Sequence, residues 1–256
     1  MKTKSAIVEN WLPRYTGTPL DEFGEYILLT NFINYVEIFA EKYKVEIKGH
    51  LKPMQTATAN NITIVNFGMG SPMAATVMDL LSAIKPKAVL FLGKCGGLKK
   101  KTQVGDLILP IAAIRGEGTS DDYLPSEIPA LPSFRLQKAV SSMIIKHKLD
   151  YWTGTIYTTN RRVWEHDESF KRYLKQIRAM GIDMETATLF VVGFVNEIPH
   201  GALLLVSDNP MFPEGVKTEE SDKLVTHEHV IKHLEIGIDS LKELINSGES
   251  VKHLRF

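Results

Sequence analysis

The chain has 256 residues, of which 44% are apolar and 23% charged, a composition typical of a folded protein that buries a large core. Thirty basic and thirty acidic residues give a formal net charge of zero, which argues against binding to nucleic acids or anionic membranes. The single cysteine, Cys95, excludes an intramolecular disulfide. Because there is also no apolar run of membrane-spanning or signal-peptide length, we expect a cytoplasmic protein.

Helix and strand patterns alternate along most of the chain. The first predicted elements are a helix over 25–43, two β-like runs around the Asn60-Asn61 turn (the second at 62–67) and a helix capped by Ser71 that ends before Lys85. Strands at 87–92 and 106–110, a helix near 134–148, a strand at 154–159 and a helix near 165–178 follow. The last elements are a short run at 180–184 that leads into an apolar helix ending at Asn196, a strand at 201–207 and a long helix over 217–246. This alternation predicts one α/β domain over residues 1–256, with three α/β/α layers around a central mixed sheet. The polar, proline-rich segment 116–133 is too long for a simple connection, and such loops are often functional.

Glycine and polar residues follow four of the predicted strands. The segments are Gly-Met-Gly-Ser at 68–71, Gly-Lys-Cys-Gly-Gly at 93–97, Asp-Met-Glu at 183–185 and Ser-Asp-Asn-Pro at 207–210. Ligands of α/β proteins bind at the carboxyl ends of strands. We therefore expect the functional site where these four segments meet.

Two carboxylates in these segments fit acid and hydroxyl chemistry. Asp208 in a partly apolar site would have a raised pKa and could donate a proton, although an aspartate at a turn or helix cap would look the same. Glu185 can accept hydrogen bonds from two vicinal hydroxyls, as in a ribose. Its alternative role, shared with Asp183, is to cap the apolar helix that follows.

The remaining polar candidates fit structural roles as well. Lys94 is the only fixed positive charge in its glycine-rich segment, but most lysines are simply solvated. Cys95 fits a small buried apolar residue better than a nucleophile. Histidines 227, 229 and 233 lack the further ligands of a complete metal shell, so we predict neither a metal nor a cofactor.

Taken together and in this order, the four segments resemble the motifs of the nucleoside phosphorylase and nucleosidase superfamily. Within that superfamily, the strings at 14–18, 28–35, 93–98, 153–165, 182–188, 206–210 and 233–238 resemble those of AMP nucleosidases. Longer members of that family carry an N-terminal regulatory domain, and we expect this chain to be a short form without it. The resemblance also implies a nucleoside phosphorylase-like fold and a homo-oligomer, namely a hexamer built of dimers.

The implied activity is hydrolysis of AMP to adenine and ribose 5-phosphate. Asp208 is expected to protonate the purine as general acid, while Glu185 holds the ribose hydroxyls and Met184 packs on the ribose face. Trp164 is our choice for packing against adenine, with a core role as the alternative. The other substrate-binding residues that we expect from these motifs are Gly70, Cys95, Gly96, Asp183 and Ser207.

The 5′-phosphate requires cations or hydroxyl donors. Arg14 is the first choice, because a guanidinium matches phosphate geometry and the neighbouring Thr16 and Thr18 can donate hydrogen bonds. Lys94 and Arg115 are second choices.

One departure from the family pattern bears on the reaction type. Hexameric purine nucleoside phosphorylases carry an arginine and a serine in the central glycine segment, and both contact phosphate. The matching positions here are Phe91 and Lys94, which favours water over phosphate as the nucleophile. A phosphate-dependent purine nucleoside phosphorylase and a catalytically silent nucleotide-binding protein remain the alternatives, and the preference among AMP, dAMP, IMP and GMP stays open.

Overall fold

The computed structural model describes residues 2–217 and 219–247. The strands are β1 (Tyr26–Thr30), β2 (Gln55–Ala59), β3 (Ile62–Asn66), β4 (Ala88–Gly97), β5 (Leu107–Gly116), β6 (Trp152–Thr159), β7 (Gly181–Asp183) and β8 (His200–Asp208). The α-helices are α1 (Lys4–Thr16), α2 (Ile33–Tyr43), α3 (Ser71–Leu81), α4 (Phe134–Lys146), α5 (Glu168–Gln176), α6 (Thr186–Val195) and α7 (Glu219–Ser247), and short 3-10 turns are η1 (Leu20–Glu22), η2 (Thr119–Asp122) and η3 (Pro213–Gly215).

The strands form one mixed sheet in the order β2-β3-β1-β4-β7-β6-β5-β8, with an additional pairing between β4 and β8. Strand β4 runs parallel to both β1 and β8, and its last residues, Gly96 and Gly97, pair with β7 in the antiparallel sense. The pairings run from β4 to β8, then through β5 and β6 to β7, which pairs with β4 again. This half of the sheet therefore closes on itself. The predicted α/β class with a mixed sheet is confirmed, and the closure is an additional feature.

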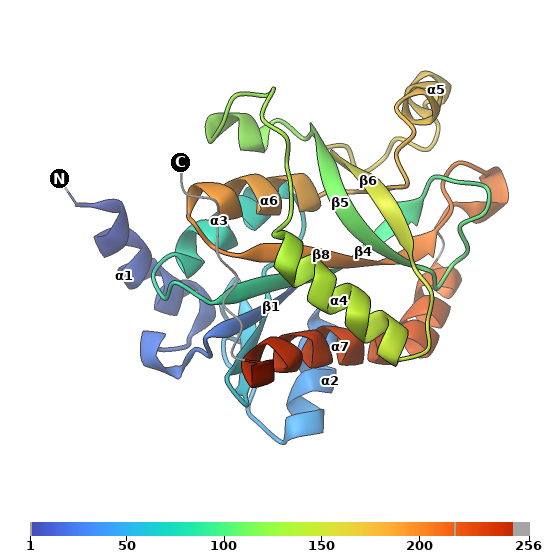
Figure 1. Cartoon of the computed structure of the whole chain (residues 1–256). Helices are drawn as coiled ribbons and strands as arrows, with labels where there is room; N and C mark the ends of the chain where they lie inside the picture. Colours follow the sequence, from blue (N-terminus) through green and yellow to red (C-terminus); the bar gives the residue numbers. More distant parts are fainter. Residues whose placement is uncertain (1, 218, 248–256) are drawn as a thin grey trace.

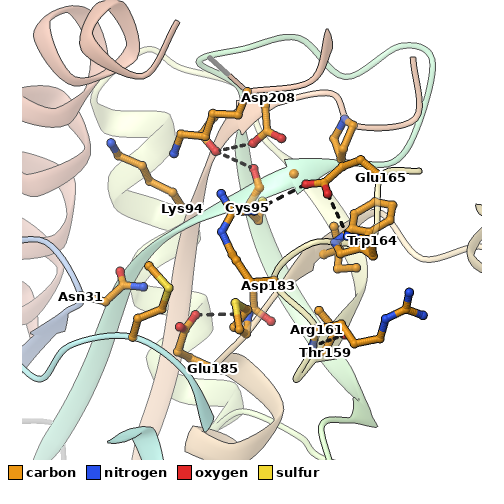
Figure 2. A pocket seen from close by; sticks show the side chains of 18 of the residues that line it. Asn31, Lys94, Cys95, Thr159, Arg161, Trp164, Glu165, Asp183, Glu185 and Asp208 are labelled. Carbon is orange, nitrogen blue, oxygen red and sulfur yellow. Dashed lines mark hydrogen bonds and ion pairs between the residues drawn. The ribbon is translucent and has the colours of Figure 1, made fainter. Parts of the chain in front are cut away.

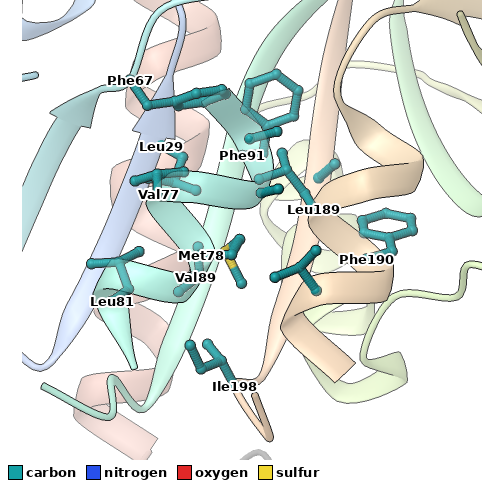
Figure 3. Packing of buried hydrophobic residues seen from close by; sticks show 14 of the residues in the cluster. Leu29, Phe67, Val77, Met78, Leu81, Val89, Phe91, Leu189, Phe190 and Ile198 are labelled. Carbon is teal, nitrogen blue, oxygen red and sulfur yellow. The ribbon is translucent and has the colours of Figure 1, made fainter. Parts of the chain in front are cut away.

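Helices cover both faces of the sheet (Figure 1). Helices α1, α3 and α6 lie on one face, and α2, α4 and α7 lie on the other. Figure 3 shows the first layer, where Val77 of α3 and Leu189 of α6 pack over Leu29 and Val89 of the sheet. Each fully buried side chain of this size contributes about 1.5–3 kcal/mol. This packing holds the N-termini of α3 and α6 side by side at the carboxyl ends of the strands.

The prediction of a helix over 25–43 is wrong in its first part. Tyr26–Thr30 is strand β1, and α2 begins only at Ile33. Every residue of β1 is buried, because parallel strands covered on both faces are apolar throughout and do not alternate. Only Asn31 and Phe32 separate strand from helix, with no glycine or proline to mark the boundary.

The segment Gly93–Gly97 belongs to strand β4 and is not a loop after it. Its pairing with β8 shifts register between Cys95 and Gly96, which is the mark of a bulge. A Cβ on Gly96 would lie 2.8 Å from Cγ of Pro210, so close packing demands glycine there. Helix α3 also begins one residue earlier than predicted, with Gly70 in place of Ser71 as its cap.

Within the described residues, no helix combines the length and apolar character that a membrane crossing needs.

Candidate active site

A pocket opens at the carboxyl ends of β1, β4, β6, β7 and β8 (Figure 2). The structure brings the following predicted site residues to its walls: Lys94, Cys95, Gly96, Trp164, Asp183, Met184, Glu185, Ser207 and Asp208. In Figure 2, Asp208 lies at one end of the pocket, whereas Glu185 and Asn31 lie together at the other.

Asp208 is the last residue of β8 and lies mostly inside the protein. The hydroxyl of Ser207 donates a 2.6 Å hydrogen bond to Oδ1 of Asp208. Burial raises the pKa of Asp208, and the negative charge of Glu165 acts in the same direction. The Ser207 hydrogen bond and the positive charges of Lys217 and Arg162 oppose this rise in pKa. A carboxyl group in this environment keeps its proton to higher pH than a solvated aspartate, as a general acid requires.

Glu185 stands at the start of α6 and is only 2% exposed. The backbone amide of Gly70 donates a 2.7 Å hydrogen bond to its Oε1, and the amide of Met184 donates to Oε2 at 3.2 Å. Asn31 also hydrogen-bonds this carboxyl group. Burial, followed by the charge of Asp183, raises the pKa of Glu185. Gly70, expected to bind substrate, is not among the residues that line the pocket, and its backbone amide instead contacts Glu185.

Asp183 holds the junction between β7 and α6 together. Its Oδ1 accepts a 2.7 Å hydrogen bond from the hydroxyl of Thr158, and its Oδ2 accepts from the backbone amide of Thr186 at 2.8 Å and from the Thr186 hydroxyl. These contacts are those of a helix-capping carboxylate. Asp183 lines the pocket, but its oxygens already have partners within the chain.

Among the described residues, four cations line the pocket, namely Lys94, Arg161, Arg162 and Lys217, and of these Lys94 alone is buried. Its Nζ lies 4.5 Å from the centre of the Phe32 ring, a cation–π contact that helps to keep an ammonium group away from bulk water. The neighbouring Cys95 is 2% exposed, and burial raises the pKa of its thiol well above the ordinary value. Cys95 therefore forms part of the wall and is not activated as a nucleophile.

Trp164 lines the pocket and is also 4% exposed within an apolar cluster. Its ring packs edge-on against Phe170, with centroids 5.4 Å apart. The expected contact with a base and the alternative core role are thus both compatible with its position.

The pocket contains several residues that sequence reasoning did not identify. They are Asn31, Phe32, Met69, Thr159, Arg161, Arg162, Glu165, Ile182, Pro210 and Lys217. Asn31 directly follows β1, and this position at a strand end would have revealed it had the strand been recognised. Arg162 and Glu165 lie in the segment between β6 and α5, for which no periodic pattern gives a direction.

The structure does not bring Arg14, Thr16 and Thr18 to the pocket. Arg14 is exposed on α1, while the hydroxyl of Thr16 donates to the carbonyl of Leu12 at 2.8 Å. The hydroxyls of Thr18 and Thr56 bond each other at 2.6 Å. These threonines are buried and hydrogen-bonded internally, so within this subunit the segment has a structural role.

Arg115 does not reach the pocket either. Its guanidinium donates to the hydroxyl of Ser120, the carboxylate of Asp121 and the backbone carbonyls of Leu124, Pro125 and Ile128. It thereby holds the long segment after β5 in place. Within this subunit Arg115 therefore has a structural role, and its contact with phosphate stays a prediction that the pocket does not support.

Among the side chains that the structure describes, no group of three or more His, Cys, Asp or Glu residues is arranged to hold a metal. His233 bonds the hydroxyl of Tyr35 at 2.8 Å and the carbonyl of Leu203 at 2.9 Å. Burial lowers its pKa to about 4, so it serves as a neutral core histidine. The side chain of His227 lies outside the described residues.

Known proteins share this architecture. Residues 17–247 match the family model of the phosphorylase superfamily. The chain is 56% identical to the AMP nucleosidase from Bacteroides thetaiotaomicron VPI-5482, whose crystal structure superposes with a TM-score of 0.87 and coverage of 97% of this chain and 100% of that one. It is 30% identical to the AMP nucleosidase of Escherichia coli K12 over 93% of this chain, and it spans 58% of the length of that relative.

More distant relatives share the fold. The crystal structure of a uridine phosphorylase from Vibrio fischeri ES114 is 22% identical, with a TM-score of 0.76 over 88% of this chain and 93% of that one. The matched family model covers most of the chain and includes every strand from β1 to β8. The chain belongs to the phosphorylase superfamily.

Proposed function

We propose that this protein hydrolyses AMP to adenine and ribose 5-phosphate. The observation that carries the proposal is the placement of two carboxyl groups at opposite ends of one pocket, namely Asp208, whose pKa is raised by burial, and the buried Glu185. Similarity to AMP nucleosidases over nearly the whole chain supports the same reaction.

Cleavage of the C1′–N9 bond requires a proton for the departing base. Asp208 donates that proton to N7 of the purine, so that adenine leaves as a neutral molecule. Its Oδ1 accepts the Ser207 hydroxyl, which leaves Oδ2 to carry the proton. General acids of this kind contribute about 100- to 10,000-fold to the rate.

The sugar passes through a cationic, oxocarbenium-like state, as in other glycoside hydrolyses. Glu185 holds the 2′ and 3′ hydroxyls, and its carboxylate places negative charge near the developing cation. Gly70, Met184 and Asn31 fix the Glu185 side chain before substrate arrives. Water then adds to C1′ to give ribose 5-phosphate, and the proton that the water releases returns to the Asp208 carboxylate through solvent.

Lys94 replaces Arg14 as the proposed ligand of the 5′-phosphate. It is the buried cation of the pocket, whereas Arg14 is exposed outside it. An ammonium group that is partly shielded from water attracts phosphate more strongly than one on the surface.

The burial of Phe91 in the core favours water over phosphate as the nucleophile. Its ring is 1% exposed and packs against Phe67 in the core, with centroids 5.7 Å apart. The position where related phosphorylases carry an arginine therefore supplies no anion-binding group here. A phosphate-dependent reaction is the second candidate, supported by the phosphorylases among the relatives.

The test is incubation of the purified protein with AMP in phosphate-free buffer, with and without added phosphate, followed by chromatography. Adenine and ribose 5-phosphate without phosphate are the expected products. Phosphate-dependent release of base from adenosine or inosine, with AMP left intact, would establish a phosphorylase. Binding of AMP without any product would indicate a silent nucleotide-binding protein.

The homo-oligomer, with six subunits, and the cytoplasmic location remain predictions from the family resemblance and the composition. Light scattering coupled to size-exclusion chromatography measures the first of them.

A further inference from the structure

A second carboxylate shares the Asp208 end of the pocket. Glu165 lies in the segment between β6 and α5, and its side chain lines the pocket together with Asp208. Figure 2 shows the Glu165 carboxylate beside Trp164 and on the Asp208 side of the pocket, away from Glu185. The two acids are close enough for the charge of Glu165 to act on Asp208.

The hydrogen bonds of Glu165 fix its carboxylate and leave room for a ligand. Its Oε2 accepts the backbone amide of Trp164 at 2.9 Å, which orients the side chain at the pocket wall. Its Oε1 lies 3.5 Å from the Arg162 guanidinium, whose side chain is 57% exposed. An ion pair this long and this exposed is weak, so a donor on a ligand can replace it at Oε1.

The purine edge that Asp208 must contact presents two groups side by side. In adenine these are N7, which accepts a hydrogen bond, and the 6-amino group, which donates one. In guanine the corresponding groups are N7 and O6, and both accept; hypoxanthine carries the same 6-oxo group. Asp208 donates its proton to N7, and Ser207 already uses one of the two acceptor sites on its other oxygen, Oδ1. A second carboxylate on the same side of the pocket supplies further acceptor sites for the 6-amino group.

We propose that Glu165 is the specificity residue of this site, accepting a hydrogen bond from the 6-amino group of adenine while Asp208 donates to N7. One acid that donates and one carboxylate that accepts match the adenine edge and no 6-oxopurine. With IMP or GMP, O6 would face the Glu165 carboxylate. Because both groups are hydrogen-bond acceptors, no hydrogen bond could form between them. This inference rests on the proposed function, since it takes the orientation of the base from the proton donation by Asp208.

The decisive variant is Glu165→Gln, because its amide keeps the size of the side chain and can donate to O6. We measure kcat/KM for AMP and for IMP in the wild type and the variant. The wild type should prefer AMP, and the variant should reduce the AMP-to-IMP ratio by roughly 5- to 100-fold, the discrimination expected of a matched base contact. Glu168→Gln makes the same chemical change on α5, outside the pocket and at a side chain that is 74% exposed, and should leave the ratio unchanged.

A purely structural role for Glu165 gives a different result. If the carboxylate only anchors Trp164 and Arg162, Glu165→Gln lowers kcat/KM for AMP and IMP by the same factor, and the proposal is overturned. A wild type without preference for AMP over IMP overturns it as well.

Binding of the free bases separates this inference from the proposed function. Titration calorimetry with adenine and with hypoxanthine measures the same selectivity without any turnover. A wild type that binds adenine better than hypoxanthine, with the preference lost in Glu165→Gln, supports the role of Glu165 even if AMP is not hydrolysed. Equal affinities of the wild type for the two bases exclude that role even if AMP is hydrolysed.

Discussion

The backbone amide of Gly70 donates a 2.7 Å hydrogen bond to Oε1 of Glu185, which lies 115 positions further along the chain. This contact joins the turn before α3 to the start of α6, two helices that pack against each other on the same face of the sheet. The helix layer thereby sets the position of the carboxylate that is proposed to hold the ribose.

Gly70→Ala tests this connection. Gly70 has φ 92° and ψ 160°, a conformation essentially restricted to glycine, and forcing alanine into it costs about 1–3 kcal/mol. A Cβ there would approach no atom closer than 3.9 Å, so backbone strain is the only penalty. The variant should shift the turn, disturb Glu185 and raise KM for AMP, as steady-state kinetics will show.

Gly118→Ala is the matched control for Gly70→Ala. Gly118 has φ 80°, and a Cβ at this position would meet nothing within 4 Å, but the residue does not line the pocket. This variant should lose stability in thermal unfolding and keep the KM of the wild type. A raised KM in both variants would mean that general destabilisation accounts for the effect.

Asp208→Asn should lower kcat by about 100- to 10,000-fold, because an amide cannot supply the proton that the leaving base needs. Binding of AMP should persist, since the substitution keeps the size of the side chain and the partner of Ser207. Rapid-quench kinetics measure the rate of base release, and calorimetry measures the affinity. Normal turnover in this variant would remove Asp208 from the role of general acid.

Asp183→Ala should act mainly on stability. The substitution leaves the hydroxyl of Thr158 and both donors of Thr186 without their acceptor, and each buried unsatisfied donor costs about 1–3 kcal/mol. Urea unfolding should therefore show a lower midpoint than the wild type. Unchanged stability together with a loss of AMP binding would instead restore the substrate contact expected from the sequence.

The residues that sequence reasoning located correctly are those whose place is determined by a strand end. Asp208 and Glu185 follow apolar runs whose carboxyl ends meet at one edge of the sheet, so their proximity could be predicted from topology alone. Glu165 and Arg162 lie in an irregular segment, where only the folded backbone determines the direction of a side chain. Arg14 was chosen for its chemistry, and nothing in the local sequence reveals that α1 packs mainly against α3 on one face of the sheet.

Strand β1 shows that local sequence also fails to determine secondary structure at some positions. Its four apolar residues continue into the apolar positions of α2, and a short apolar run of this kind fits a helical period as well as a buried strand. Tertiary context decides the matter, because β1 lies between β3 and β4 and pairs with both.

Lys94→Met tests the proposed phosphate contact. The substitution keeps most of the apolar stem and removes the charge, so kcat/KM for AMP should fall by tenfold or more, about the effect of losing 1.4 kcal/mol of binding. Adenosine has no phosphate, so kcat/KM for adenosine should change little. If both substrates lose the same factor, Lys94 acts on the reaction itself and the phosphate assignment fails.

The pH dependence of kcat/KM should identify Asp208 through its charged neighbours. Its carboxyl group must be protonated to act, and its pKa is raised by burial, so activity should fall as pH rises through that pKa. Glu165→Gln removes a negative charge that raises the pKa of Asp208, so this descending limb should move to lower pH. Arg162→Ala removes a positive charge that lowers the same pKa, and the limb should move to higher pH. Glu185 acts as the anion and would instead produce a rising limb at lower pH. Opposite shifts of the descending limb in these two variants would assign that limb to Asp208. A descending limb that does not move in either variant would assign it to another group.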